Sequence, residues 1–204
     1  MKKKILIIMM LINTVVLCLN SSFAANFSDL SKEHWAYKYI DSLADAKVIN
    51  GYPDGTFKPQ NTITRGEFFK LIMTAYKGSK AFENSTFETH WAEPYVLSAA
   101  EEGVMMNATS IEDLDIPITR LEMGVVIGKI CNRIIDDENE GSDVVYNFIT
   151  FNDLKELSVG DRNYIEFIAA IGIVNGYTDG SFGPNNNMTR AEVATVIYRF
   201  NNMK

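Results

Sequence analysis

The sequence contains few cysteines, few histidines and no excess of basic residues. Its 204 residues include 2 Cys and 2 His, and 19 Lys and Arg against 26 Asp and Glu give a net charge of −7. An acidic chain argues against nucleic acid as a partner, because phosphate binding requires a basic face. No residue spacing matches a metal site. We therefore expect no nucleic acid, no metal and no cofactor.

The first 24 residues have the pattern of a signal peptide. Lys2, Lys3 and Lys4 form a basic head, residues 5–19 are almost all apolar, and Ala24 ends a segment suited to cleavage. A retained anchor is the alternative, although the run is short for a membrane-spanning helix of about 20 residues. Cleavage after Ala24 would change the net charge to −10 and leave Cys131 as the remaining cysteine, which excludes an internal disulfide.

One motif occurs three times. Residues 63–67 are Ile-Thr-Arg-Gly-Glu, residues 118–122 are Ile-Thr-Arg-Leu-Glu, and residues 188–192 are Met-Thr-Arg-Ala-Glu. An aromatic-rich helical segment precedes each motif, and apolar residues at helical spacing follow it. A Gly-Tyr turn segment at 50–57 returns at 175–182. We predict a mainly α protein of three helix–loop–helix repeats that share one core, because a single helix pair cannot bury its apolar faces.

The repeats suggest domain boundaries. The predicted segments are a signal peptide (1–24), three repeats (25–80, 81–135 and 147–204) and an acidic, solvated linker before the last repeat (136–146).

The recurring arginine needs an explanation beyond helix capping. Threonine and glutamate in the motif form a capping box, but Arg65, Arg120 and Arg190 then stand at the positive end of a helix dipole, which costs about 0.3–1 kcal/mol. One interpretation is an anionic ligand bound by the arginine and by free helix amides. The other is an ion pair with an acid of the fold, such as Asp29, Asp54 or Asp179. We favour the ligand.

The aromatic residues fall into two groups. Trp35 and Trp91 precede helical segments, and packing in the core or between repeats is their default role. Tyr52 and Tyr177 follow Gly51 and Gly176 on loops, where a flat ring with a polar tip suits stacking under a sugar.

These motifs, in order over residues 27–67, resemble a complete S-layer homology (SLH) motif, and three in tandem are that family's usual unit. The resemblance implies a pseudo-threefold helical spindle whose grooves bind secondary cell-wall polysaccharide. In several members this polymer carries a pyruvate ketal, which presents a carboxylate. The implied ligand-binding residues are the three arginines, the two tryptophans, and the loop residues Gly51, Tyr52, Gly176 and Tyr177. The implied location is secreted, in the cell wall or S-layer of a bacterium.

The second repeat departs from the pattern, because residues 107–110 are Asn-Ala-Thr-Ser where the Gly-Tyr loop belongs. We therefore expect one or two competent grooves, and we expect Arg65→Ala to weaken binding more than Arg120→Ala without unfolding the protein. An enzyme is not favoured: His34 and His90 share one repeat position that Val159 occupies in the third copy. The alternative function is a protein-interaction or assembly module of the surface layer.

Overall fold

The computed structural model describes residues 27–105, 113–138 and 149–203. These ranges contain six α-helices, one short 3-10 helix and no strand beyond isolated bridges. The helices are α2 (Tyr37–Asp45), α3 (Arg65–Lys77), η1 (Ser79–Phe82), α4 (Glu93–Glu101), α5 (Arg120–Glu138), α6 (Val159–Ala170) and α7 (Arg190–Asn201). The predicted mainly α fold is confirmed. The predicted signal peptide, residues 107–110 and most of the acidic linker lie outside the described residues.

Three short segments, one before each of α3, α5 and α7, meet at the centre of the molecule. The Ile63 amide donates to the Met188 carbonyl, Met188 donates to Ile118, and Ile118 donates to Ile63, each over 3.0 Å. All three side chains are buried. A closed triangle of equivalent hydrogen bonds gives the fold its pseudo-threefold centre.

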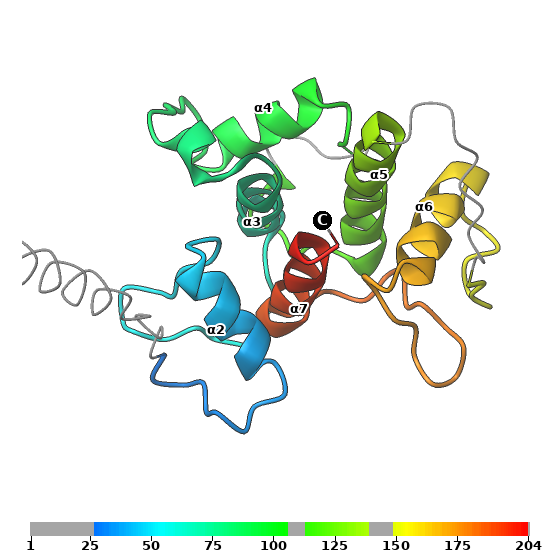
Figure 1. Ribbon diagram of the computed structural model, residues 1–204, viewed down its shortest axis with the longest axis horizontal. Coiled ribbons are helices and arrows are strands. Elements are labelled where there is room, and N and C mark those ends of the chain that lie inside the picture. The colour runs from blue at the N-terminus through cyan, green and yellow to red at the C-terminus, as the bar shows by residue number, and fades with distance from the viewer. Residues whose placement is uncertain (1–26, 106–112, 139–148, 204) are drawn as a thin grey trace, which may run out of the picture.

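The helices pack in pairs that cross the repeat boundaries. The outer helix α4 packs on α3, α6 packs on α5, and α2 packs on α7, so each outer helix rests on the inner helix of a different repeat (Figure 1). Side chains such as Phe68, Ile127 and Phe200 are fully buried between them, and each contributes about 1.5–3 kcal/mol. Surfaces between helices therefore combine residues that are distant in the sequence.

The outer helices begin in two different ways. The ring nitrogen Nδ1 of His34 accepts a hydrogen bond from the Ala36 amide, and His90 does the same for Ala92. In the third copy the Ser158 hydroxyl accepts from the Asp161 amide instead. Ser158 is therefore a side-chain N-cap of α6, whereas the histidines bind the amides of Ala36 and Ala92 just before α2 and α4. The two histidines therefore have a structural role at helix starts.

Candidate functional site

The N-terminal amides of the inner helices are already occupied. At α3 the Thr64 amide donates to Glu67 and the Glu67 amide donates to the Thr64 hydroxyl, which confirms the predicted capping box. The next two amides, of Arg65 and Gly66, donate to the carbonyls of Ile116 and Leu114 in the neighbouring repeat.

The same pattern recurs at the other two inner helices. The Arg120 amide donates to Asn186, and the Arg190 amide donates to Asn61. The expectation that these helix ends offer free amides to an anion is wrong, because carbonyls of the neighbouring repeat fill them.

Arg190 is buried at the boundary between repeats, with 7 % of its surface exposed. Its Nε donates to the Phe57 carbonyl over 2.7 Å, and its Nη1 pairs with Glu67 Oε1 at 3.1 Å. The guanidinium carbon lies 4.6 Å from the Tyr52 ring centroid and 4.7 Å from that of Phe57. An aromatic face attracts a cation, so Arg190 holds the loop of the first repeat against the third.

Arg120 has an equivalent place beside the loop of the third repeat. Its Nε donates to the Phe182 carbonyl over 2.8 Å and its Nη2 donates to the Asn175 carbonyl over 3.1 Å. The guanidinium carbon lies 5.1 Å from the Tyr177 ring centroid. Arg120 therefore holds the Tyr177 loop in place, although Arg120 belongs to the repeat whose own sequence lacks a Gly-Tyr loop.

Arg65 faces the second repeat rather than its own loop. It forms an ion pair with Glu122 and a longer one, 3.8 Å, with Asp113. The internal acids are thus Glu67 and Glu122 of the capping boxes, together with Asp113, and not Asp29, Asp54 or Asp179. The sequence could not show this, because each arginine crosses to the next repeat.

Two glycines hold the loops close to an aromatic side chain. A Cβ on Gly51 would come within 2.4 Å of the Phe27 ring, and one on Gly176 within 2.4 Å of Phe151. The Asp29 carboxylate also accepts hydrogen bonds from the Phe57 and Lys58 amides. Gly51 and Gly176 are therefore required for packing, in addition to any contact with a ligand.

One pocket gathers several of the predicted site residues. It has a volume of about 610 Å³ and lies between the first loop, α3 and the segment before α4. Gly51, Tyr52, Trp91 and Arg190, from three different repeats, line it. The full lining is Val48, Asn50, Gly51, Tyr52, Pro53, Glu67, Lys70, Leu71, Trp91 and Arg190. We call this the Tyr52 groove.

The polar groups of the Tyr52 groove are organised around Glu67. Its Oε1 accepts hydrogen bonds from the Tyr52 hydroxyl over 3.0 Å and from Arg190. Burial raises the pKa of the Tyr52 hydroxyl above its usual value, and Arg190 acts in the opposite direction. Tyr52 therefore stays protonated at neutral pH, with its ring fixed along the wall of the groove.

Both tryptophans are more exposed than their default interpretation expected. Trp35 is 55 % exposed and Trp91 is 39 % exposed, so packing in the core is wrong for both. Trp91 lines the Tyr52 groove together with residues of the loop. The wall residues that were not predicted as site residues include Lys70 and Glu67, and helix capping alone accounted for Glu67 in the sequence.

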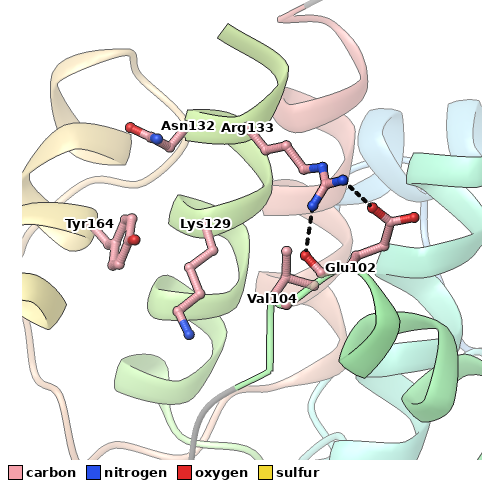
Figure 2. Close-up of a pocket in the computed structure, with 7 residues that line it drawn as sticks. Glu102, Val104, Lys129, Asn132, Arg133 and Tyr164 are labelled. Atoms are coloured by element: carbon pink, nitrogen blue, oxygen red, sulfur yellow. Dashed lines mark hydrogen bonds and ion pairs between the residues drawn. The ribbon is translucent and has the colours of Figure 1, made fainter. Parts of the chain in front are cut away.

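A second pocket, of about 420 Å³, lies between α5, α6 and the segment that follows α4 (Figure 2). Arg133 pairs with the Glu102 carboxylate at 3.3 Å and donates to its carbonyl, while Lys129 donates to the Met105 carbonyl over 2.7 Å. None of the predicted site residues lines this pocket. Its two cations already have partners, and they join α5 to the segment that follows α4.

The chain matches a family model for the S-layer homology domain at two places, residues 26–69 and 150–194. These are the two repeats that have a Gly-Tyr loop. The chain belongs to the S-layer homology family. Together, the two matched segments contain Trp35, Arg65, Arg190 and the glycine and tyrosine of each loop.

The SLH chain is similar to several curated bacterial proteins. It is 32 % identical over 166 residues to a cellulosome-anchoring protein of Acetivibrio thermocellus, covering 76 % of this chain and 35 % of that protein. It is 26 % identical over 185 residues to a surface-layer 125 kDa protein of Lysinibacillus sphaericus, covering 86 % and 15 %. An amylopullulanase of Thermoanaerobacterium thermosulfurigenes is 29 % identical over 178 residues, covering 84 % and 9 %.

The SLH chain therefore spans about a third or less of the length of these relatives. Family membership and the surface-layer relative place it at the cell surface. Within the described ranges, no helix has the length and apolar character needed to cross a membrane.

Proposed function

We propose that the protein anchors itself non-covalently to the bacterial cell wall by binding secondary cell-wall polysaccharide in the Tyr52 groove. The polymer is one that carries an anionic sugar, such as a pyruvate ketal. We further propose that residues 81–135 form a third SLH repeat, and that the protein is a binding module and not an enzyme.

The observation that carries this proposal is the composition of the Tyr52 groove. Tyr52 and Trp91 supply aromatic rings at its walls, and Lys70 supplies positive charge beyond that of the Arg190–Glu67 pair. Saccharides present apolar faces to aromatic rings, and a carboxylate seeks a cation. A local cationic pocket also lets an acidic protein bind an acidic polymer. The cellulosome-anchoring and surface-layer names of the relatives fit attachment at the wall.

Binding to purified wall sacculi tests the proposal. The chain without residues 1–24 should sediment with sacculi, and mild acid extraction of the polysaccharide should abolish the binding. Retention by extracted sacculi would contradict polysaccharide binding. Binding to a surface-layer protein, with none to sacculi, would instead establish the assembly module.

Replacement of Trp91 by Ala tests whether the polysaccharide binds in the Tyr52 groove. Because Trp91 is partly exposed, the variant should melt close to the wild type, but loss of the stacking face should weaken binding to sacculi about tenfold. The matched control is Lys80→Ala, on η1 outside the groove, which should bind like the wild type. Equal binding by the Trp91 variant and the wild type would contradict the Tyr52 groove as the site.

A further inference from the structure

Lys70 distinguishes the Tyr52 groove from the corresponding position in the other two repeats. It is the fifth residue after the motif arginine, where α5 has Val125 and α7 has Thr195. The Lys70 ammonium lies 5.8 Å from the Trp91 ring centroid. In the described part of the chain it forms no hydrogen bond or ion pair, whereas Thr195 is buried and donates to the Ala191 carbonyl.

The other cation of the groove is already neutralised. Arg190 is more than nine-tenths buried, and its charge is paired with Glu67, the acid that lines the same groove. Arg120, beside the Tyr177 loop, is likewise held by two carbonyls and by the sulfur of Met188. The excess positive charge in the Tyr52 groove is therefore that of Lys70.

We propose that Lys70, and not the motif arginine, is the residue that recognises the anionic substituent of the polysaccharide. The arginine positions the loop, the two aromatic rings hold the sugar, and the ammonium pairs with the carboxylate in the groove. The Tyr52 groove then selects the charged sugar, whereas the corresponding position beside the Tyr177 loop is the buried Thr195, which has no charge. This inference rests on the proposed polysaccharide binding.

Titrations with two forms of one polymer test the assignment. The probes are secondary cell-wall polysaccharide that carries pyruvate ketals and the same polymer after removal of the ketals. The wild type should bind the ketal form more tightly. Lys70→Gln should lose about ten- to a hundredfold in affinity for the ketal form and bind both forms alike.

Two variants control for charge. Lys70→Arg keeps the charge and should retain most of the preference for the ketal form. Lys80→Gln removes one exposed charge outside the groove and should leave both affinities within about twofold of the wild type. The affinity of Lys70→Gln should also depend less on salt than that of the wild type, because one ion pair with the ligand is lost.

The possible outcomes separate the two proposals. If the wild type prefers the ketal form and Lys70→Gln keeps that preference, the role of Lys70 is wrong and polysaccharide binding stands. If the wild type binds both forms equally, selection by Lys70 is likewise overturned. If the wild type binds neither form, polysaccharide binding and the role of Lys70 both fail.

Discussion

At the scale of single residues, the arginines show what the sequence could and could not predict. An arginine at the first position of three helices is unusual, and its recurrence favours an anionic ligand over an ion pair within the fold. The structure instead pairs Arg65 and Arg190 with acids of the fold. The partner of Arg190 proved to be Glu67 of another repeat, together with a carbonyl and two aromatic rings. A contact that spans 123 residues depends on how the repeats close around the centre, which the local pattern does not contain.

The structure changes the expected effect of removing a motif arginine. Arg190→Ala should lower the free energy of unfolding by about 3 kcal/mol, because the change removes the cation that pairs with Glu67 and the donor to the Phe57 carbonyl. Thermal and urea melts measure it, with Lys80→Ala as the control that should melt like the wild type. An Arg190→Ala variant as stable as the wild type would show that the contact contributes nothing to folding.

The expectation that Arg65→Ala weakens binding more than Arg120→Ala has lost its basis. Arg65 pairs with Glu122 in the second repeat, and Arg120 lies beside Tyr177. The ranking assumed that each arginine works with the loop of its own repeat. In the structure, each motif arginine instead contacts residues of the next repeat.

At the scale of elements, the helices and their caps were predictable, because apolar spacing and the Thr-x-x-Glu motif are local signals. The glycines were predictable only in part. Gly55 and Gly180, which follow an aspartate in the two turn segments, have the positive φ that glycine adopts most readily. The reason for Gly51 was not visible in the sequence, because it is the approach of Phe27 from 24 positions earlier.

Two glycine replacements should have opposite effects on stability. Gly51→Ala should destabilise the fold by about 1–3 kcal/mol, since the new Cβ overlaps the Phe27 ring and lies 2.7 Å from the Thr56 carbonyl. Gly160→Ala should stabilise α6 by about 0.5–1 kcal/mol, because its nearest atom is 3.9 Å away and alanine favours a helix. Urea titrations compare the two, and a stabilising Gly51→Ala would contradict the packing of the loop on Phe27.

Glu102 connects three helices through its charge. It follows α4 directly and pairs with Lys77 of α3 and with Arg133 of α5. The hydrogen bond from Lys77, and then the charges of Lys77 and Arg133, hold the pKa of Glu102 below its ordinary value of 4.5. A lowered pKa stabilises the fold above pH 4.5, and this contribution is lost as the pH falls through the folded-state pKa.

The Glu102→Gln variant should therefore melt below the wild type at pH 7, and the difference should shrink as the pH falls well below 4.5. Melting curves recorded from pH 7 to pH 3 measure it. A difference that stays constant over this range would show that the charge of Glu102 is not what connects the three helices.

At the scale of the whole molecule, the three repeats predicted the architecture but not the site. The repeats themselves predicted a shared core, and the resemblance to the SLH family implied the pseudo-threefold arrangement. The central hydrogen bonds among Ile63, Ile118 and Met188 have that arrangement. The Tyr52 groove takes its loop from one repeat, Trp91 from the next and Arg190 from the last. Such a site forms only when the three repeats pack around their common centre. The motifs of single repeats could therefore identify its residues but could not predict which of them lie together.

The chain contains two tryptophans, so a single replacement leaves Trp91 as the only one. Titration of the Trp35→Phe variant with ketal-bearing wall polysaccharide, followed by tryptophan emission, tests the Tyr52 groove most directly. The emission of Trp91 should change along a saturating curve, with the same midpoint as binding measured by sedimentation. Saturated binding with no change in Trp91 emission would contradict the groove as the site of polysaccharide binding.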